Sequence, residues 1–157
     1  MSNTQLLSSV DIFSDLSEAQ IKRIEAVCQE VTFGMEEAIF EENSPSKEFY
    51  VILEGKVAIQ LSPFMALGSS KMKPKTIASL DKGQSFGEVS LVDEGVRSAT
   101  AVSLTEKTRL LKIDRNDFVT LLKDDVHMGF TVMTNLASDL CFKIRNSNLM
   151  IREAMLY

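Results

Sequence analysis

The sequence predicts a mainly β fold, a sandwich or a barrel, with flanking helices. Between Glu30 and Ile113, short segments rich in β-branched and aromatic residues alternate with turn residues, which is the pattern of many short strands. Helical patterns precede and follow this region. The chain has 157 residues, of which 45% are hydrophobic, so its length suits a single domain with a buried core.

The first element is predicted to be a helix over residues 11–29. Ser17 and Gln20 have the spacing of a capping box, which marks a helix N-terminus. The apolar residues that follow at helical spacing are Ile21, Ile24, Val27 and Cys28. The period changes from Glu30 onward, so the helix is expected to end there.

The strand region consists of short segments separated by turn signals. The predicted strands are EVTF, AIF, FYVIL, KVAIQL, KTIASL, TAVSL and TRLLKI. The turns between them are predicted at Gly34 and at residues 43–45, 54–55, 81–83 and 105–107. Residues 62–74 are predicted to form a long exposed loop, and the basic cluster at 71–75 is interpreted as a solvated part of it.

Two helices are predicted after the last strand. Asp114 has the position of an N-cap, with Asp117 three residues later. The inner face of this helix would consist of Phe118, Leu121 and Leu122. From about Val126 the chain is predicted to be helical to near its end.

The last helix carries a heptad pattern, because apolar or small residues recur in alternating steps of four and three. These residues, called the seam below, are Val126, Phe130, Met133, Ala137, Leu140, Ile144, Ser147, Ile151 and Ala154. Part of the seam must pack on the domain, but its far half has little domain left to cover. A second copy of the helix would cover it, so the pattern predicts a homodimer.

The stretch FGEVSLVDEGVRSATA, at residues 86–101, carries the candidate binding chemistry. Gly87 lets a ligand approach the backbone closely, and a helical turn after it would direct N–H groups toward an anion. Arg97, nine residues after Glu88, offers a bidentate fork suited to a phosphate, and Glu88 would accept hydrogen bonds from ribose hydroxyls. The pattern indicates a small ligand with an anionic group beside a diol. A Glu88–Arg97 salt bridge that only pins the loop is the alternative.

This stretch resembles the phosphate-binding cassette of the cyclic nucleotide-binding domain, found in catabolite-activator-type regulators, kinase regulatory subunits and gated channels. The matching residues are Phe86, Gly87, Glu88, Ser90, Leu91, Arg97, Ser98, Ala99 and Thr100. Further matches are Ile12, Phe13 and Leu16 in the N-terminal helix, and FYVILEGKV in a central hairpin. Asn43 stands where the family usually has glycine, and Val96 where it often has proline.

The resemblance implies a cupin-like, eight-stranded jelly-roll β-barrel with an N-terminal helix and a C-terminal helix that serves as lid and dimer interface. The nucleotide-binding jelly roll would occupy residues 1–125, and the long helix residues 126–157. The lid would reach the base through Leu140, Lys143, Ile144 and Arg145.

The resemblance also implies the ligand-binding residues. They are Gly87, Glu88, Val89, Ser90, Arg97, Ser98 and Ala99, with Phe86, Ile59, Ile77 and Ile144 as further candidates. Arg97 would neutralise the cyclic phosphate, and Glu88 would take the ribose 2′-hydroxyl. N–H donors would come from the region of Gly87, Ser98 and Ala99. Ile59 and Ile77 fit a plain core equally well.

The implied function is that of a cyclic nucleotide sensor whose occupancy repositions the C-terminal helices. The ligand is expected to be cAMP rather than cGMP, although Ser98 fits either a phosphate contact or a contact to guanine. Two alternatives are a ligand-free dimerising scaffold with a degenerate pocket and a truncated transcription regulator of the catabolite-activator type. Because the sequence stops at Tyr157 after the long helix, no helix-turn-helix is expected to read DNA.

Other classes of function have little support. The formal net charge of −5 does not favour binding to nucleic acid or to an anionic membrane. No apolar run approaches the roughly 20 residues of a spanning helix, and no signal peptide is readable, so a cytoplasmic protein is expected. A single histidine, His127, is too few for a metal site or a catalytic triad, so neither a metal nor enzyme activity is expected. Cys28 and Cys141 are interpreted as buried thiols within helices.

Overall fold

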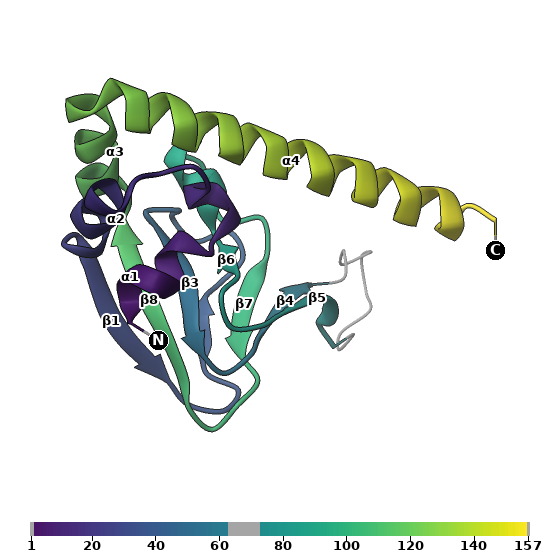
Figure 1. The fold of residues 1–157 in the computed structure, drawn as a ribbon. Coiled ribbons are helices and arrows are strands. Elements are labelled where there is room, and N and C mark those ends of the chain that lie inside the picture. Colours follow the sequence, from purple (N-terminus) through teal and green to yellow (C-terminus); the bar gives the residue numbers. More distant parts are fainter. Residues whose placement is uncertain (1, 63–72, 157) are drawn as a thin grey trace.

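Two four-stranded antiparallel sheets form the body of the protein (Figure 1). The computed structural model describes residues 2–62 and 73–156. The first sheet has the order β1-β8-β3-β6 and the second β2-β7-β4-β5. The strands are β1 (Cys28–Phe33), β2 (Ala38–Phe40), β3 (Glu48–Glu54), β4 (Val57–Leu61), β5 (Lys75–Leu80), β6 (Ser85–Phe86), β7 (Thr100–Ser103) and β8 (Thr108–Asp114). The predicted mainly β jelly roll is thereby confirmed. Most of the predicted loop at 62–74, and the first two residues of its basic cluster at 71–75, lie outside the described residues.

The N-terminal region differs from the single helix predicted over residues 11–29. It contains α1 (Asn3–Ser8), the 3₁₀ helix η1 (Asp11–Phe13) and α2 (Glu18–Glu25). Ser17 is the N-cap of α2 in extended conformation and forms the predicted capping box with Gln20, so no helix can run through it. Cys28 is not helical, because it begins β1 and pairs with Ile113 of β8. The prediction was wrong because a local apolar period does not show where the chain leaves a helix to pair with a distant strand.

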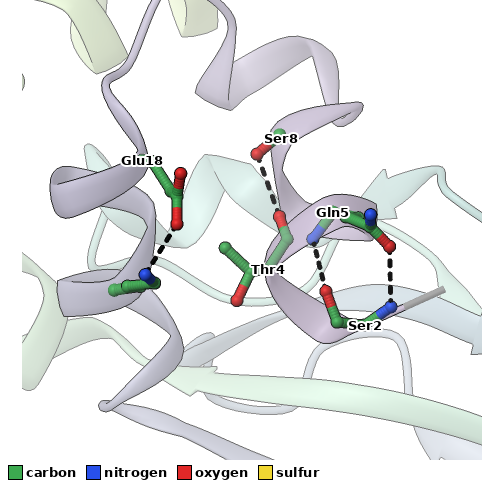
Figure 2. A pocket seen from close by; sticks show the side chains of 6 residues that line it. Ser2, Thr4, Gln5, Ser8 and Glu18 are labelled. Carbon is green, nitrogen blue, oxygen red and sulfur yellow. Dashed lines mark hydrogen bonds and ion pairs between the residues drawn. The ribbon is translucent and has the colours of Figure 1, made fainter.

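The helix α1, which the sequence patterns had not revealed, also begins at a capping box, formed by Ser2 and Gln5. It packs beside α2, and the hydroxyl of Thr4 donates a hydrogen bond to Glu25. Figure 2 shows a pocket between the two helices. Its lining consists of Ser2, Thr4, Gln5, Ser8, Glu18 and Lys22. None of the candidate ligand-binding residues lines this pocket.

The core has two parts, one on each side of β3. The larger part joins the helices to the first sheet around three fully buried rings, in which Phe118 lies 5.2 Å from Phe49 and 6.0 Å from Phe13 between ring centroids. The smaller part fills the space between the sheets and includes Tyr50, Ile52, Val57, Phe86, Ala101 and Leu110. Alternate residues of β3 therefore face different cores, which explains why its run FYVIL is apolar throughout.

The C-terminal part of the chain folds into α3 (Arg115–Asp124) and α4 (Val126–Ala154). Asp114 accepts hydrogen bonds from the backbone N–H groups of Asn116 and Asp117, so the predicted N-cap is confirmed. The side-chain amide of Asn135, in the first half of α4, donates to the backbone carbonyls of Ile12 and Ser14 and thereby ties α4 to η1.

The face of α4 that packs on the domain coincides only in part with the predicted seam. Its buried residues are Met128, Val132 and Leu136, joined at the edge by the seam residues Met133 and Leu140. The seam residues Val126 and Phe130 are 77% and 74% exposed. The second half of α4 extends past the barrel (Figure 1), and Ile144 and Ile151 are exposed there. A heptad pattern marks an apolar line on a helix, but it does not show which neighbour the line meets.

The two cysteines differ in environment, contrary to the expectation of two buried thiols. Cys141 lies on the exposed half of α4 and is solvent-accessible, whereas Cys28 is partly buried. Burial, with the nearby Glu25 carboxylate as a smaller cause, raises the pKa of Cys28 to about 12. At neutral pH the reactive thiol of this chain is therefore expected to be Cys141.

Candidate functional site

A tight left-handed turn opens the segment at residues 86–101. Gly87 has a φ of +76° and caps a single 3₁₀ turn, η2 (Glu88–Leu91), so the predicted helical turn is confirmed. The backbone N–H of Ser90 donates to the carbonyl of Gly87 at 3.2 Å. Leu91 packs into the larger core, and the Ser90 hydroxyl is buried without a hydrogen-bond partner. The turn thus buries Glu88, whereas Val89 points toward solvent and is 44% exposed.

Replacing Gly87 by alanine is expected to damage this turn. The positive φ costs about 1–2 kcal/mol for a residue with a Cβ atom. That atom would also lie 2.8 Å from Nη1 of Arg97 and 3.3 Å from the carbonyl oxygen of Glu48. Thermal unfolding should show a lower midpoint for Gly87→Ala. Gly83→Ala is a useful comparison because Gly83 also has a positive φ, but no atom lies within 4 Å of the added Cβ. Equal losses for both variants would contradict the close contact.

A second segment, residues 42–46, holds the other end of this stretch in place. The N–H of Arg97 donates to the carbonyl of Ser44, and the N–H of Asn43 donates to the carbonyl of Arg97, both at 2.8 Å. Asn43 adopts a left-handed conformation with a φ of +66°. Asparagine tolerates a left-handed conformation better than most residues. The turn therefore forms although Asn43 stands where the family that this sequence resembles usually has glycine.

Arg97 is buried, with only 4% of its surface exposed. Its Nη2 donates to the backbone carbonyl of Glu48 at 2.6 Å and lies 3.3 Å from the Glu48 carboxylate. Its Nη1 donates to the carbonyl of Gly87 at 3.4 Å, whereas Nε is buried without a partner. Burial lowers the pKa of Arg97, and the nearby Tyr50, Glu48 and Glu88 oppose this shift. The guanidinium is therefore a desolvated cation with unused donor capacity.

An aromatic cluster supports the guanidinium. Phe40 of β2 lies under Arg97, with the guanidinium carbon 4.0 Å from the ring centroid. Tyr50 and Phe86 stack at 5.3 Å between centroids, and each lies about 6 Å from Phe40 (6.0 Å and 5.9 Å). Burial, with a smaller contribution from the Glu48 carboxylate, raises the pKa of Tyr50 to about 12. The cluster therefore holds the guanidinium of Arg97 against the smaller part of the core.

Glu88 is 5% exposed and pairs with Lys143 of α4, whose Nζ lies 2.5 Å from the carboxylate. Lys143 also pairs with Asp139 at 2.7 Å. Burial by itself would lower the pKa of Lys143, but the carboxylates of Glu88 and Asp139 outweigh it, so the pKa is raised. Glu88 and Arg97 make no ion pair with each other. The simple loop-pinning salt bridge considered from the sequence is therefore not what these two residues form.

The structure brings some of the candidate residues together and leaves others apart. Glu88, Ser90, Arg97 and Phe86 are buried in the same segment, whereas Ser98 is exposed and Ala99 half-buried. Ile59 of β4 packs against the smaller core. Ile77 of β5 is 42% exposed, and Ile144 of α4 is 61% exposed.

Two residues that contact Arg97 were missed by sequence reasoning, Phe40 and Glu48. Phe40 had appeared only as part of the strand AIF, and Glu48 lies 49 positions before Arg97 in the chain. Neither has a local pattern that distinguishes it from an ordinary strand residue. The pairing of β2 with β7 and the contacts of residues 42–46 with the end of the segment place them beside Arg97.

Other kinds of site find no support in the described part of the chain. Within residues 2–62 and 73–156, no group of three or more His, Cys, Asp or Glu side chains is placed to hold a metal ion. In the same residues, no helix has the length and apolarity to cross a membrane. His127 is an exposed residue in the first turn of α4.

Sequence comparisons identify relatives of this segment and of most of the chain. A model of the cyclic nucleotide-binding domain family matches residues 30–125. The Cyclic AMP receptor protein of Thermus thermophilus is 30% identical over 138 residues, which are 88% of this chain and 59% of that protein. Human cGMP-dependent protein kinase 2 is 28% identical over 112 residues, which are 71% of this chain and 14% of the kinase. The chain therefore spans only part of the length of these relatives.

Solved structures show the same arrangement of elements. The Thermus thermophilus catabolite activator protein has a TM-score of 0.75 and 29% identity, over 90% of this chain and 62% of that one. A cyclic nucleotide-binding domain from Methylobacillus flagellatus has a TM-score of 0.77 at 22% identity, over 95% of this chain and 80% of that one, and it supports the fold alone. Together with the family match over residues 30–125, these likenesses show that the chain belongs to the cyclic nucleotide-binding domain family.

Proposed function

We propose that the chain is a regulatory module that binds a cyclic nucleotide, cAMP rather than cGMP, at the segment of residues 86–99. The single observation that carries this proposal is that Arg97 and Glu88 are both buried in one cassette but pair with different partners. A salt bridge built for stability would join them to each other. Two buried groups of opposite charge, held apart, fit a ligand that has an anionic and a hydroxyl-bearing end.

Each residue of the cassette has a defined part in this proposal. Arg97 would bind the cyclic phosphate, because its Nε is buried without a partner and two of its other contacts are to backbone carbonyls. Glu88 would accept the ribose 2′-hydroxyl. Gly87 keeps space beside Nη1 of Arg97, where any Cβ would intrude. Val89, Ser90, Ser98 and Ala99 would contribute backbone contacts, with Ile59 and Ile77 toward the sugar and base.

Isothermal titration with cAMP and with cGMP tests the ligand directly. The expected result is saturable binding of one molecule per chain, with the lower dissociation constant for cAMP. Tighter binding of cGMP would overturn the base preference but leave the site in place. If neither nucleotide binds at concentrations up to about 1 mM, where the binding free energy is only about −4 kcal/mol, the proposal fails.

The link from the site to α4 runs through Lys143. In this structure Lys143 occupies the Glu88 carboxylate that the ribose hydroxyl would need. We propose that α4 has two positions, one in which Lys143 pairs with Glu88 and one in which it does not. A ligand that binds the Glu88 carboxylate favours the second position, and this difference in affinity shifts the populations of the two. The first half of α4 is fixed to η1 by Asn135, so movement would be confined to the second half. Ile144 and Arg145 would then approach the base as a lid.

Cys141 provides a probe for this movement. It is exposed on α4, two residues before Lys143, whereas Cys28 has a pKa raised to about 12. A thiol-reactive fluorophore added at neutral pH should therefore label Cys141 alone. Its emission is expected to change on addition of cAMP to the wild-type chain. Binding measured by calorimetry with no change in emission would show that occupancy does not reposition α4.

The second half of α4 is also the proposed interface of a homodimer. Leu149, Met150 and Ile151 are exposed there. A parallel copy of the helix would cover the seam residue Ile151, in keeping with the heptad pattern. Ile151→Asp is expected to convert a dimer into a monomer in sedimentation equilibrium, because it places two charges at the seam. A wild-type chain that sediments as a monomer at all concentrations would contradict this interface.

A specific observation also favours a second candidate, a dimerising scaffold with a degenerate pocket. Arg97 is already paired with Glu48, and Glu88 with Lys143, as they would be in a permanently empty site. The titration separates the two functions, because a scaffold would show no saturable binding. For either function we propose a cytoplasmic protein without enzyme activity. Neither function requires a metal ion or a nucleic acid.

A further inference from the structure

The guanidinium of Arg97 already has an anion beside it. Oε2 of Glu48 lies 3.3 Å from Nη2 of Arg97, and the two side chains are 32% and 3% exposed. Building on the nucleotide-binding function proposed above, we infer that Glu48 limits the affinity of the site, because its carboxylate competes with the ligand's phosphate for Arg97. Glu48 is then an affinity-setting residue that touches the phosphate-binding arginine and not the ligand.

The Glu48 carboxylate is not needed to hold Arg97 in place. The shorter bond to the guanidinium comes from the backbone carbonyl of Glu48, at 2.6 Å. The carbonyl of Gly87 accepts from Nη1, and the ring of Phe40 supports the planar face at 4.0 Å. All three contacts remain when the side chain of Glu48 is changed. The carboxylate therefore contributes charge to the site and little positioning.

The charges around the site explain the sign of the expected effect. Glu48, Glu88 and Asp139 supply three carboxylates, and Arg97 and Lys143 supply two cations. A phosphate that joins Arg97 adds another negative charge at a place where carboxylates already outnumber cations. Repulsion between this phosphate and Glu48 lowers the affinity, and it is moderated because Glu48 is about one-third exposed and partly screened by solvent.

The exposure of Glu48 also allows it to yield. A carboxylate that is 32% exposed can turn toward water and be solvated there when the phosphate arrives, which a fully buried carboxylate cannot do. Competition of this kind raises the dissociation constant without closing the site. The proposal therefore predicts a wild-type chain that binds, but more weakly than its cassette allows.

The experiment compares three proteins by isothermal titration with cAMP and with cGMP, at low and at high ionic strength. They are the wild type, Glu48→Gln and the matched control Glu54→Gln. Glu54 lies at the other end of β3 and pairs with Arg109, also at 3.3 Å, so its change removes the same charge away from the site. Glu48→Gln is expected to bind about three- to ten-fold more tightly than wild type at low ionic strength, with a smaller gain at high ionic strength. Glu54→Gln is expected to match the wild type.

The dissociation constants of the three proteins distinguish competition by Glu48 from an effect of net charge and from a failure of the proposed function. Equal or weaker binding by Glu48→Gln, with an unchanged thermal midpoint, overturns the competition while the nucleotide-binding function stands. An equal gain in both variants shows an effect of net charge alone and also overturns it. If no protein of the three binds either nucleotide, the proposed function itself fails and the competition fails with it. A gain confined to Glu48→Gln that shrinks with added salt supports the inference.

Discussion

Replacing Arg97 by leucine is expected to weaken cyclic nucleotide binding by about 2–4 kcal/mol, or roughly 30- to 1000-fold. The reason is that a buried, charge-assisted contact to the phosphate is lost and leucine offers no donor in its place. The folded state should survive, because Glu48 is partly exposed and can turn to solvent when its partner is removed. Titration calorimetry measures the loss, and circular dichroism with thermal melting verifies the fold.

Arg109→Leu is the matched control for this loss. Arg109 also pairs with two carboxylates, those of Glu30 and Glu54, but on the outer face of the first sheet and 35% exposed. Its replacement removes the same charge and should leave the dissociation constant unchanged. Retained affinity in Arg97→Leu would show that the phosphate is bound elsewhere, and an equal loss in both variants would show a response to net charge.

Truncating Phe118 to alanine is expected to destabilise the protein by about 3–5 kcal/mol, a large share of the roughly 5–15 kcal/mol that holds a typical domain together. Phe118 is fully buried on α3, with its ring edge-on to Phe49 of β3 and beside Phe13 of η1. Its removal would leave a cavity where the helices meet the first sheet. Denaturant unfolding followed by circular dichroism measures the free energy of unfolding.

Phe142→Ala provides the comparison, because Phe142 is 59% exposed on α4. This change should alter the free energy of unfolding by no more than about 0.5 kcal/mol. Phe118→Leu keeps most of the volume and should cost less than Phe118→Ala. A Phe118→Ala protein as stable as Phe142→Ala would mean that α3 does not seal the core as described.

Local signals in the sequence predicted much of the fold. The capping box at Ser17 and the N-cap at Asp114 each marked the start of a helix, because a cap is satisfied within one turn of the chain. The strands were found from their β-branched and aromatic content. The two-residue strand β6 and the six-residue helix α1 were missed, since elements so short carry too few residues to show a period.

The predicted helix over residues 11–29 shows the limit of such signals. Ile21 and Ile24 do belong to a helix and are fully buried, but Val27 and Cys28 continue the apolar spacing past its end. Cys28 instead joins β1, where pairing with Ile113 of β8 supplies its backbone partners. A strand partner 85 positions away in the chain cannot be read from a local period.

The sequence by itself determined the cassette: the glycine at 87 where a left-handed turn is required, the glutamate after it, and the arginine nine residues later. These features are local, because backbone conformation and spacing depend on neighbouring residues. The tertiary structure alone decided which groups face these charges, bringing Glu48 to Arg97 over 49 positions and Lys143 to Glu88 over 55. It also decided which face of α4 meets the domain. The physical reason is that a buried charge takes whatever partner the packing of distant elements places within reach, and that packing is settled by the whole core.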